Sequence, residues 1–292
     1  MKLTPEQKDG RYGYIGSGHS SAVMSRNPYA TKYDVWAQVT GKVPPIKMTP
    51  PMQAGLILES AIIDWLEIKD DIEVKREVDC FSGDSLHVGP AYCGAHLDGI
   101  YTDGEGNNII VEAKTSGLYN FLDRDEWGDE ETDQVPVQYI IQCHHQMICC
   151  GAEVAVIPAL IPPLGFRKYV VRRNEEVIDA MLATYEKFWD CVKRDVPPDD
   201  SIPSLPTIKN WVRSADAPEV SVDAALVSAY EQAAQSAKDA GKVKDLAFSQ
   251  LMMHVGDAEC ASFEGGILTY RAAKNGSRRL YIKREKNHAE EN

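Results

Sequence analysis

The stretch AYCGAHLDGIYTDGEGNNIIVEAKT, residues 91–115, decides the fold of this chain. Its two outer parts, 91–101 and 108–115, are rich in residues that favour strands. The segment DGEGN at 103–107 lies between them and has the composition of a hairpin loop. We therefore predict two adjacent antiparallel strands joined by a short loop.

The predicted register of this hairpin brings charged side chains together. If Asp98 lies opposite Glu112, then Thr102 lies opposite Asn108, which leaves a loop of ordinary length. Side chains alternate between the two faces of a strand. The register therefore predicts that Asp98, Glu112 and Lys114 share one face.

A third carboxylate is expected from a helix before the hairpin. Residues 52–68 have apolar side chains at helical spacing, and Glu59 lies in the middle of that apolar stripe. A carboxylate in such a position is costly unless it is paired or binds a cation. Gly55, one turn earlier, leaves room for a close approach.

These four groups, Glu59, Asp98, Glu112 and Lys114, suit one kind of chemistry. Carboxylate oxygens are hard ligands that fit Mg²⁺ or Mn²⁺ better than zinc. A neighbouring lysine can orient a metal-activated water and stabilise charge on a phosphate. The plainer alternative is a surface hairpin with a salt bridge, because Glu-x-Lys by itself is common.

The rest of the pattern predicts an α/β (α+β) fold with a central mixed sheet flanked by helices. The order of elements in this core is helix, three strands, helix and strand. Besides those already described, the predicted strands cover 72–79, 153–161 and 166–172, and the predicted helices cover 135–150 and 174–195.

We expect three segments: a first domain at 1–198, a proline-rich linker at 199–220, and a C-terminal part at 221–292 with a pair of helices and a β-meander. Between Gly265 and Lys286 the chain has seven Lys or Arg residues and one acid. A basic hairpin of this kind can track a DNA backbone through residues such as Arg278 and Arg279, or it is a solvated basic surface.

Composition excludes several classes of protein. The 292 residues, 43% of them hydrophobic, exclude a disordered, collagen-like or coiled-coil chain. No apolar stretch is long enough to span a membrane, and the first residues have no apolar leader, so we expect a cytoplasmic protein. The net charge of -13 argues against general coating of nucleic acid.

Seven cysteines without a Cys-x-x-Cys pair predict reduced, buried thiols.

The charged residues resemble a known nuclease motif. Asp98 followed by Glu112-Ala113-Lys114 is similar to the PD-(D/E)xK motif, with Leu97 where the family has proline. The predicted order of elements matches the restriction-endonuclease-like core of that superfamily. More narrowly, several segments resemble the YqaJ-type viral recombinases, relatives of the lambda exonuclease, in order and spacing. They are RYGYIGSG at 11–18, NPYAT at 27–31, MQAGLILE at 52–59, AHLDG at 95–99, VEAKT at 111–115, VPVQYIIQ at 135–142 and FW at 188–189.

The resemblance implies a Mg²⁺-dependent 5'→3' exonuclease that acts on double-stranded DNA ends and releases 5'-mononucleotides, with Mn²⁺ also expected to support activity. It implies resection of ends for single-strand annealing recombination, with an annealing protein as partner. A ring-shaped homotrimer is also implied, located in the host cytoplasm if a phage encodes it.

The resemblance also assigns roles in a metal site. It implies that Asp98, Glu112 and the carbonyl of Ala113 bind the metal. Glu59 would serve a second metal or its water shell. Lys114 would position the attacking water.

The predicted helix 135–150 adds a polar stripe. Gln138, Gln142 and Gln146 are spaced by four and form one face of the helix. The resemblance implies that Gln142 orients Lys114 or a phosphate, with Tyr139 on the same side.

Recognition of a 5'-phosphate is implied for Arg11, whose guanidinium suits a phosphate. The family serine seven residues later is replaced here by Gly18. Ser17 or Ser20 would then substitute for it, or a backbone N–H.

Two other functions fit the same residues. One is a structure-specific or nicking endonuclease on the same core. The other is a catalytically silent DNA-binding module, against which the complete set of four charged groups argues.

Overall fold

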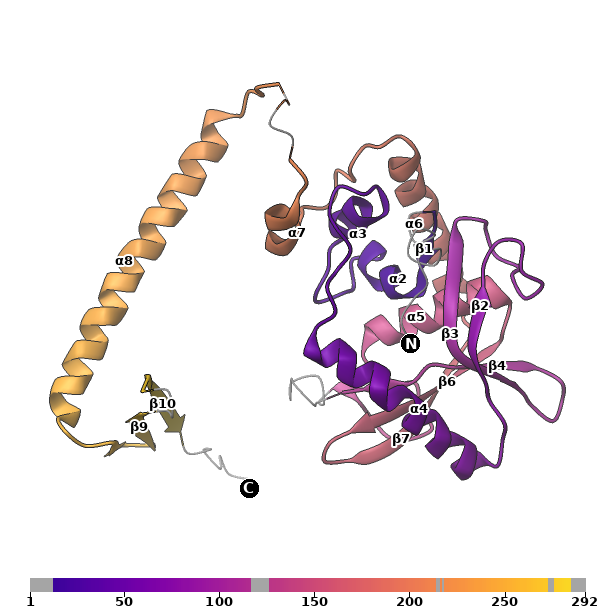
Figure 1. Cartoon of the computed structure of the whole chain (residues 1–292), viewed down its shortest axis with the longest axis horizontal. Helices are drawn as coiled ribbons and strands as arrows, with labels where there is room; N and C mark the ends of the chain where they lie inside the picture. Colours follow the sequence, from indigo (N-terminus) through magenta and orange to yellow (C-terminus); the bar gives the residue numbers. More distant parts are fainter. Residues whose placement is uncertain (1–12, 117–125, 214–215, 217, 273–275, 285–292) are drawn as a thin grey trace. The chain divides into compact units, whose positions relative to one another are not determined.

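The computed structural model describes residues 13–116, 126–213, 216, 218–272 and 276–284. By its internal contacts the chain divides into two units, residues 1–214 and 215–292, each described here by itself (Figure 1). The elements of the first unit are β1 (Ile15–Gly16), α2 (Ser17–Val23), α3 (Lys32–Val39), α4 (Pro50–Asp70), β2 (Lys75–Cys80), β3 (Cys93–Thr102), β4 (Asn108–Val111), β5 (Lys114–Thr115), α5 (Val137–Cys150), β6 (Val154–Ile161), β7 (Gly165–Arg172), α6 (Glu175–Lys193) and α7 (Leu205–Asn210).

A mixed seven-stranded sheet forms the centre of the first unit, as predicted. Its path runs β1-β3-β4-β6-β5, with β2 paired to β3 and β7 paired to β6. Strands β2, β3 and β4 are antiparallel neighbours, whereas β4 and β5 run parallel to β6. A parallel pair needs a crossover connection, and α5 supplies it between β5 and β6.

The predicted hairpin register is confirmed. Thr102 lies opposite Asn108, and Gly99 lies opposite Val111. The loop is closed by Asp103, whose carboxylate accepts hydrogen bonds from the backbone N–H groups of residues 105 and 107. Among the described residues the ladder ends at Gly99 and Val111, and the continuation of this register places Asp98 level with Glu112.

The predicted strand 108–115 is interrupted at residues 112–113, which separates β4 from β5. Both pieces lie along β6 in one register, with Lys114 opposite Ala159, and the Glu112 N–H donates to the Val156 carbonyl at 3.0 Å. In a continuous parallel ladder residue 158 would donate to the Glu112 carbonyl, but Pro158 has no N–H. The ladder therefore opens at the residues that carry the charged groups.

Helices cover both faces of the sheet (Figure 1). On one face α4 buries Ile63 and Leu66 in a small cluster with β4 and β6. On the other face α5 packs on β3, with α2 and α6 against α5. That larger core includes the fully buried Tyr169, Tyr185 and Phe188. The hairpin lies between α4 and α5, so side chains of both helices reach it.

Helix α5 carries a buried histidine that makes folding stability depend on pH. His145 is 0% exposed, and its ring nitrogens contact the Tyr185 hydroxyl at 3.1 Å and the Gly94 carbonyl at 3.0 Å. Burial lowers the pKa of His145 from its ordinary 6.5 to about 4. Below pH 6.5 the unfolded chain therefore binds a proton that the folded chain does not.

We expect the free energy of unfolding to fall by about 2 kcal/mol between pH 7 and pH 5 through this group, and the loss to level off below about pH 4. Urea unfolding of the wild type and of His145→Gln at both pH values measures it. The variant should be less stable at pH 7 but should lose about 2 kcal/mol less than the wild type on acidification. An equal loss in both proteins would contradict the assignment to His145.

The cysteines are free thiols, most of them buried, as the sequence predicts. Cys80, Cys93, Cys143, Cys149 and Cys150 are buried, whereas Cys191 is partly exposed and Cys260 exposed. Burial raises the pKa of both Cys80 and Cys93 to about 12. These two thiols therefore stay protonated and unreactive at neutral pH.

Part of the predicted linker, residues 199–220, is folded. Helix α7 lies within this range, and the Ser204 N–H donates to the Asp34 carboxylate at 2.8 Å. The Val212 N–H donates to the Lys42 carbonyl, and Trp211 stacks on Trp36. The segment up to residue 212 therefore packs on α3, because its tryptophan and polar backbone groups find partners there.

The second unit contains α8 (Ala224–Val255), β8 (Cys260–Phe263), β9 (Gly266–Ala272) and β10 (Arg278–Arg284). The three strands form the predicted antiparallel meander. The predicted pair of helices is wrong: α8 is one helix of 32 residues that runs through Gly241. A glycine inside a helix costs about 1 kcal/mol, which the surrounding alanine and lysine residues offset.

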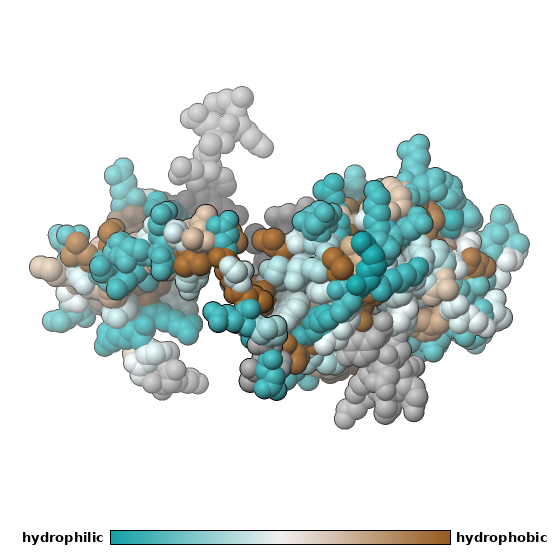
Figure 2. All heavy atoms as spheres, turned by 90° about the horizontal axis from the view of Figure 1, so that it is seen from above, coloured by the Kyte–Doolittle hydropathy of each residue, from teal (hydrophilic) through white to brown (hydrophobic). Residues whose placement is uncertain are grey.

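The surface of each unit mixes hydrophilic and apolar side chains (Figure 2). Helix α8 has no buried residue, although Leu226, Tyr230 and Leu246 on it are large and apolar. Among the described helices, none combines the length and the apolar character needed to cross a bilayer.

Candidate active site

The carboxylate of Glu112 is the centre of a buried polar cluster. Glu112 is only 2% exposed and follows β4 at the break in the ladder. Its Oε1 accepts hydrogen bonds from the Lys114 ammonium and from Gln142 Nε2, the latter at 2.5 Å. Its Oε2 accepts from Gln146 Nε2 at 2.5 Å. A buried charge with three donors is satisfied and held in one orientation.

Asp98 lies beside this cluster on β3. Its Oδ2 accepts a hydrogen bond from the Ala113 N–H at 2.9 Å, a backbone group that the break in the strand leaves outside the ladder. Burial, and then the negative charge of Glu112, raise the pKa of Asp98 well above its ordinary value. The two carboxylates are therefore close enough to repel each other in a poorly solvated place.

Lys114 is the cation of the site. Burial alone would lower its pKa, but the carboxylates of Glu112 and Asp98 outweigh burial and raise the pKa of Lys114 above its ordinary value. The ammonium lies 5.1 Å from the centre of the Tyr139 ring, within the range of a cation–π contact. Lys114 therefore stays protonated at neutral pH.

Glu59 lies on α4, within electrostatic range of Glu112 and Asp98. Burial and the negative charge of Glu112 raise the pKa of Glu59. Gly55, one turn earlier, faces Thr115: a Cβ added to it would lie 3.8 Å from the Thr115 hydroxyl. The helix thus approaches β5 closely here, and it brings the third carboxylate near the other two.

The donor set suits a divalent cation, although the side chains are not arranged around one. Among the described residues, no three His, Cys, Asp or Glu side chains are grouped as metal ligands. The carboxylate of Glu112 is engaged by Lys114 and the two glutamines. The three carboxylates nevertheless feel one another's charge, and Lys114 is the cation that contacts Glu112. This excess of negative charge, carried by hard oxygen donors, fits Mg²⁺ or Mn²⁺.

Gln146 has a larger part in the site than the sequence assigned to it. It is 0% exposed and donates to Glu112, whereas from the sequence we predicted only a polar helix face that includes Gln146 and assigned a role to Gln142 alone. The spacing of four residues between Gln142 and Gln146 indicated that both lie on one face of the helix. The sequence does not reveal that both amides converge on one carboxylate.

We expect Gln146→Met to lower the free energy of unfolding by about 1.5–3 kcal/mol, because a buried carboxylate loses one of its donors. Gln138→Met, on the same helix face, is the matched control and should change stability by less than about 0.5 kcal/mol. Gln138 is half-buried, and no hydrogen bond joins it to Glu112 in the described part of the chain. Equal effects in urea unfolding would show that the contact with Glu112 contributes little.

The structure describes some of the residues that we expect to bind a 5'-phosphate. Arg11 lies outside the described residues. Ser17 and Gly18 begin α2, where Ser17 is partly exposed and Gly18 is exposed. Ser20 does not fit the prediction: it is 0% exposed, and its hydroxyl donates to the Ser17 carbonyl at 2.5 Å. A hydroxyl facing the core cannot meet a phosphate, so Ser17 is the better candidate.

Arg278 and Arg279 lie on β10 of the second unit. They are exposed and neighbouring in sequence. Their side chains therefore point to opposite faces of the small sheet.

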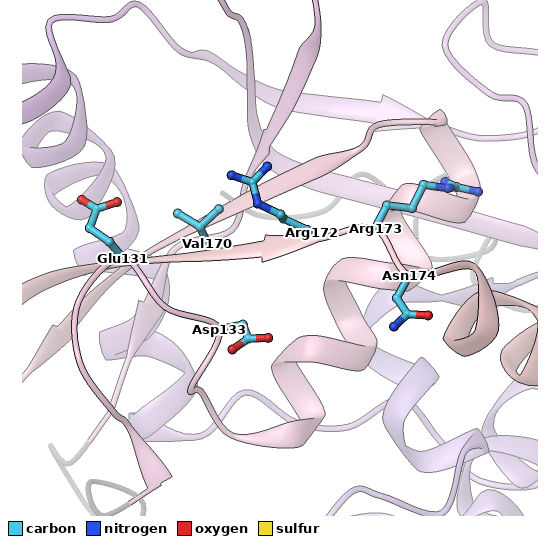
Figure 3. A pocket seen from close by; sticks show the side chains of 6 residues that line it. All are labelled: Glu131, Asp133, Val170, Arg172, Arg173 and Asn174. Carbon is cyan, nitrogen blue, oxygen red and sulfur yellow. The ribbon is translucent and has the colours of Figure 1, made fainter.

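A pocket of about 510 Å³ lies elsewhere, between β7 and the segment before α5 (Figure 3). Both signs of charge line it, from Glu131 and Asp133 and from Arg172 and Arg173. Arg173 is already engaged, because it contacts Glu175 at 2.5 Å and the Met147 carbonyl at 3.1 Å. The pocket contains none of the clustered groups around Glu112 and does not resemble a catalytic site.

Two solved structures share the fold of the first unit. The alkaline exonuclease LHK-Exo from Laribacter hongkongensis superposes with a TM-score of 0.51 at 19% identity, covering 66% of this chain and 94% of that one. The same enzyme in complex with dAMP gives a TM-score of 0.52 at 18% identity, with the same coverage. At this identity the likeness establishes the shared fold alone, a central mixed sheet flanked by helices.

Sequence comparison gives the family. The uncharacterized protein YqaJ of Bacillus subtilis (strain 168) is 28% identical over 182 residues, which are 60% of this chain and 52% of that protein. The chain thus spans about half the length of this curated relative. The sequence model of the YqaJ-like viral recombinase domain matches residues 8–153, half of the chain, and this range includes Glu59, Asp98, Glu112 and Lys114. This chain therefore belongs to the YqaJ-like viral recombinase domain family.

Proposed function

We propose that this protein is a Mg²⁺-dependent deoxyribonuclease that removes nucleotides 5'→3' from the ends of double-stranded DNA. The observation that carries the proposal is the buried Glu112 cluster, in which Lys114 stays protonated between Glu112 and Asp98. Membership of a viral recombinase family and a fold shared with an alkaline exonuclease support the same reading.

Asp98 and Glu112 would hold the cation, together with the carbonyl of Ala113, and Glu59 would serve a second metal or its water shell. When bound, Mg²⁺ supplies Lewis-acid polarisation of a phosphodiester and makes water more acidic. Mn²⁺ prefers similar oxygen ligands and should replace it. For Glu112 to serve as a ligand, its carboxylate must exchange at least one of its present donors.

The protein's own groups divide the remaining work. Lys114 is charged, so it orients the attacking water and stabilises negative charge on the phosphate rather than removing a proton. Gln142 and Gln146 hold Glu112 in place, and the Ala113 N–H does the same for Asp98. The Tyr139 ring makes a cation–π contact with the Lys114 ammonium and so helps to position it.

The direction of digestion depends on how the enzyme recognises the end of a DNA strand. Arg11 is the residue proposed to bind a 5'-phosphate, with Ser17 or a backbone N–H at the start of α2 as a second contact. In this proposal the enzyme releases 5'-mononucleotides and leaves a 3' overhang for an annealing protein. A homotrimeric ring would place these groups around a channel for the duplex.

The test is digestion of linear duplexes labelled at either end, with and without a 5'-phosphate, in Mg²⁺, Mn²⁺ or EDTA. We expect early release of the 5' label as a mononucleotide, at least about tenfold faster digestion with a 5'-phosphate, and no product in EDTA. Cleavage of closed circular DNA at a comparable rate would replace this proposal by an endonuclease. Binding without any cleavage in either metal would leave only a DNA-binding module.

A further inference from the structure

The small sheet of the second unit is strongly basic in an acidic protein. The chain has a net charge of -13, yet β8, β9 and β10 together carry five Lys or Arg residues and no acid. Helix α8 before it carries three acids and three lysines. The positive charge of this unit is therefore concentrated on its strands.

The strand register divides these cations between two faces. Tyr270 on β9 contacts Phe248 of α8 at 5.6 Å between ring centres, which identifies the face that meets the helix. The guanidinium of Arg278 lies 5.9 Å from the Tyr270 ring centre, and that of Arg284 lies 6.0 Å from the Phe263 ring centre. Both arginines are thus held on the helix-facing side by aromatic rings.

The opposite face presents cations to solvent. Alternation along β10 puts Arg279, Tyr281 and Lys283 there, and Arg271 lies directly opposite Arg279 on β9. The other residues paired into this face, Ile267 among them, carry no charge. Among the described residues, Arg279 and Lys283 make no ion pair, and Arg271 only approaches Glu259 at 3.9 Å.

This arrangement costs stability in the absence of an anion. Like charges directly opposite each other on neighbouring strands repel, as Arg271 and Arg279 do. An anion between them removes that repulsion. Arg279 and Lys283 are four residues apart, about 13 Å along the strand, so they would meet different charges of an extended polyanion.

An aromatic side chain lies between the two cations of β10. Tyr281 is 64% exposed and opposite Thr269, so its ring is open to a ligand. An acidic protein surface would use the cations but not the ring. An unpaired base can stack on such a ring while its phosphates meet the flanking cations.

We propose that the outward face of this sheet, made by Arg271, Arg279, Tyr281 and Lys283, is a binding site for single-stranded DNA. The choice of DNA as the polymer rests on the proposed function, whereas the preference for a single strand rests on the exposed Tyr281 between the cations. The site would hold the strand that remains after the other has been digested.

The experiment measures binding of the full chain to a fluorescent 30-nucleotide single strand in EDTA, by anisotropy between 50 and 200 mM KCl. Arg279→Gln/Lys283→Gln should weaken binding about tenfold at 100 mM KCl. It should also make the slope of log K against log salt less negative by about 1.4, because each lost phosphate contact removes about 0.7. Tyr281→Ala should weaken single-strand binding about fivefold or more and leave duplex binding within twofold.

Arg278→Gln/Arg284→Gln is the matched control: it removes two charges from the same strand on the helix-facing side. It should change the affinity less than about threefold and leave the slope unchanged. Equal effects of the two double variants would overturn the proposal, because only net charge would then matter. Displacement of the strand by polyglutamate of equal charge, with no effect of Tyr281→Ala, would assign the face to acidic proteins instead.

Because EDTA prevents metal-dependent hydrolysis, the outcome is independent of the nuclease activity. Loss of the expected binding pattern with normal digestion would remove this site alone. Normal binding without digestion in Mg²⁺ would remove only the proposed catalytic function.

Discussion

Asp98→Asn should abolish metal-dependent DNA hydrolysis, by at least about 10³-fold in kcat, and at the same time stabilise the metal-free protein. The amide cannot replace a carboxylate ligand, but its oxygen can still accept from the Ala113 N–H. Burial and the charge of Glu112 both raise the pKa of Asp98, so the ionised form is disfavoured in the folded state. Removing that charge should raise the free energy of unfolding by about 1 kcal/mol.

Single-turnover digestion and thermal unfolding in EDTA measure the two effects. Glu105→Gln is the matched control, because Glu105 is an exposed carboxylate in the loop of the same hairpin. It should leave both quantities unchanged. If Asp98→Asn lowers the free energy of unfolding, the hydrogen bond that the Asp98 carboxylate accepts stabilises the protein more than the repulsion between Asp98 and Glu112 destabilises it.

Lys114→Met should lower kcat by about 10²–10⁴-fold and, unlike Asp98→Asn, destabilise the protein by about 3 kcal/mol. The lysine is the only cation among the described contacts of Glu112, which is 2% exposed. Methionine fills a similar volume but leaves a buried carboxylate without its counter-charge. Both variants therefore lower the activity, but Asp98→Asn should raise the free energy of unfolding and Lys114→Met should lower it.

The control for the stability effect is Lys242→Met, which breaks an exposed pair with Asp239 at 2.9 Å. Exposed pairs contribute little, so this variant should lose less than about 0.5 kcal/mol. Lys114→Arg should recover part of the stability, since it keeps the charge, but not full activity, because a guanidinium presents its donors differently. If Lys114→Met unfolds at the same urea concentration as the wild type, the ion pair between Lys114 and Glu112 does not stabilise the protein and this prediction is wrong.

Several parts of the fold and the site were predictable because their causes are local. Turn residues and strand alternation gave the hairpin, so the pairing of Thr102 with Asn108 followed from the sequence and was confirmed. The position of Glu59 on an apolar helix face likewise predicted that it points inward, and its raised pKa agrees with that position.

Other parts were missed because distant residues decide them. The Gly- and Ser-rich segment before residue 25 has low helix propensity, yet α2 forms there, where it packs on α5. The interruption of the strand at 112–113 follows from Pro158 on β6. Helix α8 runs through Gly241, which the sequence alone reads as an end.

The sequence by itself determined the mixed sheet flanked by helices and the pairing of Asp98 with Glu112, because alternation and turn chemistry act over a few residues. The tertiary structure alone decided that Gln142 and Gln146 both bind Glu112 and that Ser20 faces the core. It also decided which arginines of β10 face solvent. The physical reason is that such contacts depend on how separate elements pack, and packing is set by the whole core rather than by any one segment.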